Sequence, residues 1–292
     1  MKKKRQTIVF AVLFFAMFLF LADKMETRAA STYTIYVNRS SNIVNVVNSR
    51  TGKLVRAMYC STGRDYRTIR GTYNTVSKMR WHALNHGVWG QYCTRIHGSY
   101  LFHSVWYYST NKTKMSTAEY NKLGSQASAG CIRLAVVDAK WIYDHCRVGT
   151  KVVIGESRKL KAPTRKLLKI STKSRTGWDP TDPDPKNPYY PKLTMKKSAA
   201  KKIEYGSKFN PVDMIKVSSR ITPTKILLKN VKVKGKVNTK KAGRYKVTYT
   251  LTDPRTLLTV TKKYTFTVKA KPKSQTTETT EIKDTEATTE IN

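Results

Sequence analysis

The stretch Leu123-Gly-Ser-Gln-Ala-Ser-Ala-Gly-Cys-Ile-Arg-Leu134 places a cysteine after a run of small residues and a few positions before a predicted helix. Small residues let the backbone approach a bound molecule closely. Backbone N–H groups at Gly130 and Cys131 could therefore form an oxyanion hole, the set of donors that acyl transfer requires. A nearby helix start and a basic surround favour the thiolate. On local chemistry alone, a nucleophilic cysteine and a buried structural cysteine are equally good interpretations of Cys131.

A nucleophilic thiol needs a base, and the chain offers five histidines: His82, His86, His97, His103 and His145. His103 interrupts a hydrophobic run, residues 100–106, where a strand with buried neighbours would hold an imidazole rigidly. His97 is its competitor, and a hydrogen-bonded scaffold histidine is the alternative for both. His145 lies near the C-terminal end of a predicted helix, where a cation is favoured in any case.

The sequence on both sides of the cysteine is dominated by short runs that are typical of β-strands. Strands are expected over residues 33–37, 43–47, 54–60, 68–76 and 151–154, with further strands and long loops over 81–102. Helical patterns are confined to residues 117–123 and 136–146, and Asp138 lies in the first turn of the second one. The expected fold class is therefore mainly β, with one or two helices.

Composition divides the rest of the chain into three segments. Residues 156–199 are rich in Lys, Arg, Ser, Thr and Pro, which predicts an extended basic linker. Residues 200–272 return to alternation, strictest over 245–251 and 264–268, which predicts a small β-sandwich. Residues 273–292 are rich in Thr and Glu and poor in hydrophobic residues, so we expect them to be disordered.

The first thirty residues have the layout of a secretory signal peptide. A cationic start at residues 2–5 precedes 15 apolar residues, Ile8 to Ala22, and a patch of small residues begins at Ala29. Cleavage near Ala29 or Ala30 is the preferred interpretation. An uncleaved membrane anchor is the alternative, although the apolar run is shorter than the ~20 residues that span a bilayer. Either way the body faces the outside of the cell, which argues against a nucleic-acid partner.

The chain carries 56 basic and 18 acidic side chains, a formal net charge of +38. The excess is spread along the body, and residues 200–272 alone hold 19 basic and 3 acidic side chains. A body this basic needs an anionic partner. For a secreted protein the candidates are anionic wall polymers and lipid head groups, with membrane association limited to an uncleaved N-terminal segment.

Four cysteines are present, Cys60, Cys93, Cys131 and Cys146. Disulfides become possible outside the cytosol, but if one cysteine is a nucleophile, the other three cannot all pair with one another. Their spacing contains no CxxC pair, which argues against a zinc site.

Two motifs together resemble the catalytic domain of the YkuD-type L,D-transpeptidases: Phe102-His-Ser104 and then Ser128-Ala-Gly-Cys-Ile-Arg133. Three further features match the family: a helix at residues 138–143, the end of the domain at 149–152, and a strand that leads into a loop at 60–63. The resemblance therefore covers residues 31–155. It implies a β-sandwich catalytic domain that is followed by the linker and the second sandwich.

The resemblance also implies roles for single residues. Cys131 would be the nucleophile and His103 its base, with the imidazole oriented by the backbone carbonyl of Ser104. The amides of Gly130 and Cys131 would hold the oxyanion. On the substrate side it implies two further residues, Arg133 and Ser128.

The chain departs from the family pattern in two ways. The histidine that the family has two positions before the cysteine is replaced by Ala129, so activation of the thiol rests on His103 alone. The spacing from His103 to Cys131 is longer than usual, and residues 107–122 are expected to form a loop over the cleft.

The implied reaction is acyl transfer in peptidoglycan, without a metal or organic cofactor. The thiol would attack a tetrapeptide stem, release the terminal D-Ala and pass the acyl group to a neighbouring stem, which gives a 3→3 cross-link. Water as acceptor would make the enzyme an L,D-carboxypeptidase, and a non-catalytic wall-binding protein is the rival class. Residues 203–270, through the motif at 241–253, resemble bacterial Ig-like modules. The expected location is secreted and associated with the wall.

Overall fold

The computed structural model describes residues 31–199 and 201–272. The predicted signal peptide and the predicted disordered tail lie outside the described residues. Within the described part, the chain forms two compact units. The chain passes from the first to the second between Tyr190 and Pro191, and Asp253–Leu258 also belongs to the first unit. Among the described helices none is long and apolar enough to cross a membrane.

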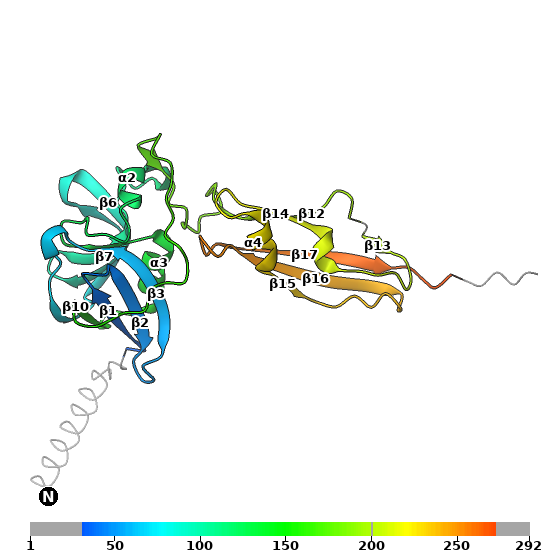
Figure 1. Cartoon of the computed structure of the whole chain (residues 1–292), viewed down its shortest axis with the longest axis horizontal. Coiled ribbons are helices and arrows are strands. Elements are labelled where there is room, and N and C mark those ends of the chain that lie inside the picture. Colours follow the sequence, from blue (N-terminus) through cyan, green and yellow to red (C-terminus); the bar gives the residue numbers. More distant parts are fainter. Residues whose placement is uncertain (1–30, 200, 273–292) are drawn as a thin grey trace, which may run out of the picture. The chain divides into compact units, whose positions relative to one another are not determined.

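The first unit is built on a nine-stranded sheet in the order β4-β10-β1-β2-β3-β9-β7-β6-β5 (Figure 1). The strands are β1 (Tyr33–Asn38), β2 (Ile43–Asn48), β3 (Leu54–Ser61), β4 (Gly71–Asn74), β5 (Ser77–Leu84), β6 (Val88–His97), β7 (Tyr100–Ser104), β9 (Ile132–Leu134) and β10 (Lys151–Gly155). Two of its strand pairs are parallel, β1 with β10 and β7 with β9. The strand β3 joins the two halves of the sheet because it pairs with β2 on one side and β9 on the other. The predicted strands are therefore confirmed, with small shifts at their ends.

The helix α3 (Val136–His145) packs against β6 and β7 and confirms the helix predicted after the cysteine motif. Its buried face includes Val136, Ala139 and Ile142. Asp138 also lies on that face and is only 1% exposed, because it is paired with Arg56 and Arg165. The second predicted helix is the short α2 (Thr117–Tyr120), which begins where the Ser116 hydroxyl accepts a hydrogen bond from the Glu119 amide at 3.3 Å.

The segment 156–190 differs from the extended linker expected over 156–199, because it packs onto the first unit. Asp179, Thr181 and Asp182 are fully buried. The Asp179 carboxylate accepts a hydrogen bond from the Val136 amide at 3.0 Å, and the Thr181 hydroxyl accepts one from the Val137 amide at 3.1 Å. The first turn of a helix has no internal acceptors for its N–H groups, so these two side chains complete the start of α3.

A short pair of strands fixes the same segment further along the chain. The strand β11 (Thr176–Gly177) pairs with β8 (Met115–Ser116), which belongs to the insertion between β7 and β9. The proline content of the segment prevents long regular elements. It does not prevent burial, because the Asp, Thr and Asn side chains supply the hydrogen bonds that a sheet or helix would otherwise supply.

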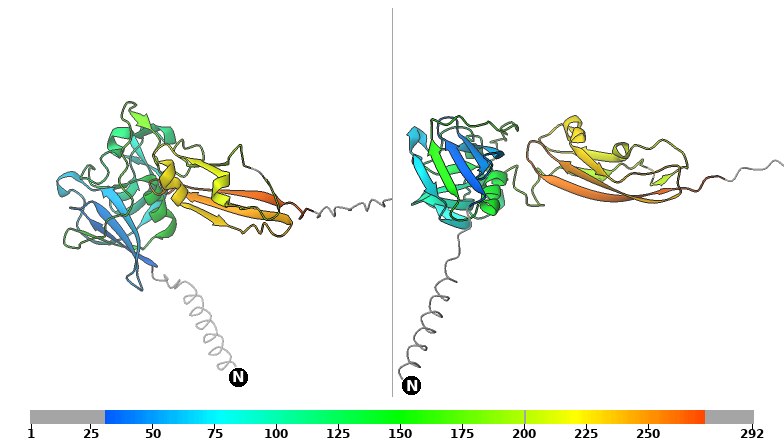
Figure 2. Two further views of the ribbon diagram at one scale, coloured as in Figure 1. Left: turned by 45° about the vertical axis from the view of Figure 1, so that its right-hand side comes forward. Right: turned by 90° about the horizontal axis from the view of Figure 1, so that it is seen from below.

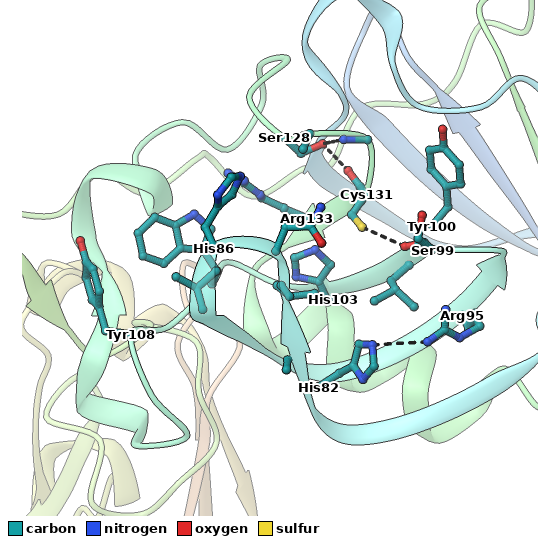
Figure 3. Close-up of a pocket in the computed structure, with 18 of the residues that line it drawn as sticks. His82, His86, Arg95, Ser99, Tyr100, His103, Tyr108, Ser128, Cys131 and Arg133 are labelled. Atoms are coloured by element: carbon teal, nitrogen blue, oxygen red, sulfur yellow. Dashed lines mark hydrogen bonds between the residues drawn. The ribbon is translucent and has the colours of Figure 1, made fainter.

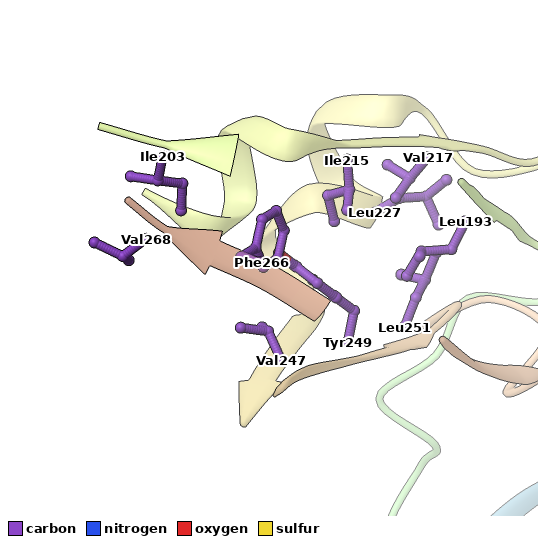
Figure 4. Close-up of a cluster of buried hydrophobic side chains, with 10 residues drawn as sticks. All are labelled: Leu193, Ile203, Ile215, Val217, Leu227, Val247, Tyr249, Leu251, Phe266 and Val268. Carbon is purple, nitrogen blue, oxygen red and sulfur yellow. The ribbon is translucent and has the colours of Figure 1, made fainter. Parts of the chain in front are cut away.

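The second unit is a small sandwich, as predicted. Its four-stranded sheet has the order β13-β17-β16-β15, with β13 (Lys202–Ile203), β15 (Val231–Lys234), β16 (Gly243–Thr252) and β17 (Thr259–Val268). A two-stranded sheet of β12 (Lys192–Met195) and β14 (Ile215–Ser218) and the helix α4 (Thr224–Lys229) complete the unit. The core between them gathers Leu193, Ile215, Leu227, Tyr249 and Phe266 (Figure 4).

Candidate active site

Cys131 and His103 come from neighbouring strands. The strands β7 and β9 run parallel, with His103 opposite Arg133, and Cys131 directly precedes β9. Both Cys131 and His103 line a cleft of about 480 Å³, and Figure 3 draws them close together at its centre. The structure therefore brings together the two residues that the sequence motifs paired across 28 positions.

His103 is held as a neutral base. Its side chain is 2% exposed, and the Nδ1–H group donates to the carbonyl oxygen of Ser104 at 2.6 Å. This bond fixes the tautomer and leaves Nε2 as the acceptor. Burial, together with the nearby Arg133 guanidinium, lowers the pKa of His103 to about 3, against the opposing effect of the Ser104 bond. The imidazole is therefore uncharged at neutral pH.

Cys131 is a protonated thiol in the resting site. Burial raises the pKa of this thiol, although the Leu101 amide and the Arg133 and Arg95 guanidinium groups act in the opposite direction. The Sγ–H group donates to the carbonyl oxygen of Ser99 at 3.5 Å (Figure 3). A neutral thiol beside a neutral imidazole can react by general-base catalysis, in which the proton moves as the bond to the substrate forms.

The loop before Cys131 is fixed by hydrogen bonds at both ends of Gly130. The carbonyl oxygen of Gly130 accepts from the Thr68 hydroxyl at 2.7 Å. Its amide donates to the Ser128 hydroxyl at 3.0 Å, and that hydroxyl donates to the carbonyl oxygen of Cys131 at 2.6 Å. The sequence indicated Gly130 as an oxyanion donor, but in this structure its N–H group already has an acceptor.

Gly130 is also the residue type that this loop needs. Its φ is +151°, and a Cβ added there would lie 2.9 Å from the Tyr100 ring. Both conditions exclude a larger side chain. The neighbouring Ala129, which stands where the related family has a histidine, is exposed at the mouth of the cleft.

Arg133 is held in the cleft by a residue that sequence reasoning did not identify. Its Nη1 lies 2.5 Å from a carboxylate oxygen of Glu119, and the other oxygen of Glu119 lies 2.6 Å from the Lys122 Nζ. Glu119 belongs to α2, within the insertion 107–122 that was expected to cover the cleft. That insertion is packed rather than open, because Tyr107 and Met115 are fully buried.

The cleft is cationic. Three guanidinium groups line it, from Arg95, Arg133 and Arg175, and its lining contains no aspartate or glutamate. Arg175 comes from the packed segment after the catalytic domain, so a linker interpretation gave no reason to place it here. Its Nε donates to the Tyr108 hydroxyl at 2.6 Å, and its guanidinium lies 4.6 Å from the centre of the Tyr108 ring.

The other histidines fall into two groups. His82 and His86 line the cleft, and the His82 Nε2 lies 3.3 Å from an Arg95 nitrogen. His97 and His145 do not line it. His97 is exposed against the Tyr73 ring, and His145 stacks on the Trp141 ring on α3. The structure thus favours His103 over His97 as the base.

The remaining cysteines have no direct part in the site. Cys60, Cys93 and Cys146 are fully buried, and all four cysteines are free thiols. Burial raises the pKa of Cys93 and of Cys146 to about 12, which makes them unreactive at neutral pH. Among the described residues no cluster of His, Cys, Asp or Glu is arranged to hold a metal ion.

Comparison with known families identifies both units. Residues 32–154 match the YkuD family, the L,D-transpeptidase catalytic domain. Residues 193–268 match the Ig-like domain of bacterial surface proteins. The chain therefore contains the two domain types that its motifs resemble.

Individual relatives match only parts of the chain. The curated protein YciB of Bacillus subtilis (strain 168), whose name assigns it provisionally to the L,D-transpeptidases, is 52% identical over 58 residues, 20% of this chain and 29% of YciB. A solved fused Zn-dependent amidase/peptidase/peptidoglycan-binding protein from Clostridium acetobutylicum ATCC 824 is 31% identical, with a TM-score of 0.33 over 42% of this chain and 51% of that one. An L,D-transpeptidase from Mycobacterium tuberculosis H37Rv is 24% identical, with a TM-score of 0.35 over 42% and 57%. The chain thus spans less than a third of YciB and little more than half of these two structures.

Proposed function

Because residues 32–154 match the L,D-transpeptidase catalytic domain, we propose that the chain forms 3→3 cross-links in peptidoglycan through a thioester on Cys131. The observation that carries this proposal is the placement of Cys131 beside a neutral, oriented His103 in one cleft. A thiol with a positioned base is the arrangement that nucleophilic acyl transfer needs.

In the first step the thiol turns from the Ser99 carbonyl to Nε2 of His103, which accepts its proton. The sulfur attacks the carbonyl between the third residue and the terminal D-Ala of a tetrapeptide stem. The C–N bond then breaks, and the imidazolium returns the proton to the leaving amine of D-Ala. The stem remains on Cys131 as a thioester, and His103 is again neutral.

In the second step an amine of a neighbouring stem attacks the thioester. His103 takes a proton from this amine and gives it to the departing sulfur, which restores the thiol and completes the cross-link. Water as acceptor would release a tripeptide stem instead, which is the L,D-carboxypeptidase outcome.

The oxyanion of each step is assigned to the amide of Cys131. The Gly130 amide is already bonded to the Ser128 hydroxyl, so Gly130 and Ser128 act as positioning residues that hold the loop. The sequence predicted two oxyanion donors, the amides of Gly130 and Cys131, and this assignment keeps only the second. It retains the requirement that a donor points to where charge develops.

The charge of the cleft supports a stem peptide as substrate. Stems carry carboxylates. Of the three arginines that line the cleft, Arg133 is paired with Glu119, whereas Arg95 and Arg175 form no ion pair among the described residues. Arg133, held by Glu119, lies beside the nucleophile and is the arginine best placed to bind the donor stem. The match to an Ig-like domain of bacterial surface proteins supports a location at the wall.

The direct test is mass analysis of products from a purified disaccharide-tetrapeptide. A dimer that has lost one D-Ala supports the transpeptidase, and a tripeptide monomer alone supports the carboxypeptidase. Cys131→Ala should abolish both products. His103→Ala should lower the acylation rate by about 10² or more, the usual scale for a positioned base. His97→Ala is the matched control and should change the rate little. Full activity of Cys131→Ala would leave only the wall-binding function.

A further inference from the structure

The second unit has a sheet surface that the proposed reaction does not use. One side of the four-stranded sheet faces the core, to which β12, β14 and α4 also supply residues (Figure 4). Side chains alternate between the two sides of a strand, so the positions between the core residues point to the opposite side. Figure 2 shows α4 on the core side of the long β16–β17 hairpin in the view from below.

Every position of β13, β15, β16 and β17 on this outer side is Lys, Arg or Thr, and we call the surface the Lys/Thr face. Six positions are basic and exposed: Lys202, Lys232, Lys234, Arg244, Lys246 and Lys263. The other seven are threonines of β16 and β17. Neither an acidic nor an apolar side chain interrupts the face.

The strand register arranges these residues in rows. Lys234, Thr248 and Lys263 lie side by side across three strands. A second row holds Lys202, Thr267 and Arg244. Rows on the same side of a strand follow one another every two residues, about 6.7 Å, and neighbouring strands lie about 4.8 Å apart. The face is therefore a regular array of cations and hydroxyl groups.

The charges on this face are not balanced within the protein. Among the described residues none of its six cations forms an ion pair, and Glu204 of the same unit pairs with Lys269 instead. In the strand register each of these cations lies opposite a threonine, so no two of them are directly paired and none has an opposite charge beside it. The threonines contribute to the fold, because threonine is favoured in strands and two cross-strand pairs are hydrogen-bonded, Thr250 with Thr261 at 3.2 Å and Thr252 with Thr259 at 2.9 Å. The six cations gain no comparable partner among the described residues. The pattern therefore indicates an anionic ligand.

We propose that the Lys/Thr face binds a phosphodiester polymer of the cell wall. Ammonium and hydroxyl groups are both donors to phosphate oxygens, and a polymer with regularly spaced phosphates can follow the regular rows. The face has no aromatic side chain on which nucleic-acid bases could stack. It has no apolar side chain that could enter a membrane interface. These features favour a flexible polyanion that needs neither base stacking nor insertion of apolar side chains.

The test compares two variants of the full chain that carry the same net charge. The face variant has Lys232→Gln, Lys234→Gln, Lys246→Gln and Lys263→Gln. The control variant has four exposed lysines of the same unit, outside the face, changed in the same way: Lys192, Lys216, Lys225 and Lys229. Binding is measured by sedimentation with isolated walls, before and after hydrofluoric acid removes the phosphodiester polymers. Thermal unfolding of both variants checks that they fold.

We expect the face variant to bind untreated walls about 10- to 100-fold more weakly than the wild type, and the control variant to lose less than about threefold. Wild-type binding should fall to the level of the face variant on stripped walls, and soluble poly(glycerol phosphate) should compete for it. Equal losses in the two variants would show that only net charge matters and would overturn the proposal. So would undiminished binding to stripped walls, or stronger competition by single-stranded DNA at equal phosphate.

Discussion

Gly90 of β6 tests whether the position of the His103 ring controls the reaction. A Cβ added at Gly90 would lie 3.0 Å from Nδ1 and 3.1 Å from Cβ of His103, and 3.1 Å from the sulfur of Cys93. Ordinary contacts begin at 3.4 Å, so the neighbours must move by a few tenths of an ångström. The ring has little room to do so, because it is 2% exposed and tied to the Ser104 carbonyl at 2.6 Å.

Gly90→Ala should therefore displace the imidazole and weaken its bond to Ser104. Overpacking of this kind costs about 1–3 kcal/mol of stability. A shift of 1 Å in a reacting group costs roughly 10² in rate, so we expect kcat/KM to fall about tenfold for a shift of a few tenths. The assay is product formation from the disaccharide-tetrapeptide at a temperature where the variant is folded by tryptophan fluorescence.

Two variants make the result interpretable. Gly155→Ala is the matched control, because a Cβ there meets nothing within 4 Å, and its activity should stay within about twofold of the wild type. Adding Cys93→Ala to Gly90→Ala removes the sulfur on the other side of the new methyl group and should restore part of the activity. Wild-type activity of Gly90→Ala would refute the view that a confined His103 ring is needed for the chemistry.

Further predictions concern titration, the packed segment and the substrate. The rate of iodoacetamide alkylation at Cys131 should rise with pH, and its midpoint should lie above that of an ordinary thiol because burial raises the pKa of Cys131. A midpoint near the ~6.5 of an imidazole would instead indicate a preformed thiolate–imidazolium pair. A carbapenem should add its mass to the wild type and not to Cys131→Ala, and the absence of any adduct at high drug concentration would indicate an occluded site. Burial raises the pKa of Asp179 to about 6, above the ~3.9 of an unfolded chain, so the folded state holds the extra proton between these values. The free energy of unfolding, relative to Asp179→Asn, should consequently fall by at most about 3 kcal/mol as pH rises from 4 to 7. Fluorescence of the five tryptophans, all within residues 81–178, reports this transition, and a flat difference would mean that Asp179 titrates normally. Arg175→Gln should raise KM about tenfold for a stem with free carboxylates and little for an amidated stem, with the exposed Arg147→Gln as control, and equal effects on both stems would exclude carboxylate recognition by Arg175.

Much of the candidate site follows from the sequence because its signals are local. The small residues before Cys131 and the hydrophobic run around His103 each lie within a few positions of the residue they identify. The strands and α3 follow from periodicity, which is also a local property. The family resemblance predicted that the motifs around His103 and Cys131 act together. In the structure the parallel pairing of β7 with β9 brings them into one cleft.

The Lys/Thr face could be predicted from the sequence only in part. The alternation in β16 and β17 is visible in the sequence and predicts one polar side for each strand. Only the register shows that lysines of β15 and β17 flank the same threonine of β16. A shift of one residue in either pairing would turn the cations of one strand toward the core side.

Periodicity and composition predict a mainly β chain with a small second sandwich and a large basic excess, and the family resemblance adds the sandwich of the catalytic domain and the pairing of Cys131 with His103. Three features are visible only in the folded chain: residues 156–190 pack against the first domain, Glu119 holds Arg133, and the Gly130 amide is already bonded. The difference lies in the range of the interactions. Helix and strand preferences arise between neighbours in the chain, whereas each of these contacts joins groups whose separation in space depends on the completed fold. The composition of 156–190 is that of a linker, and its burial depends on the unpaired amides at the start of α3, which exist only once that helix has formed.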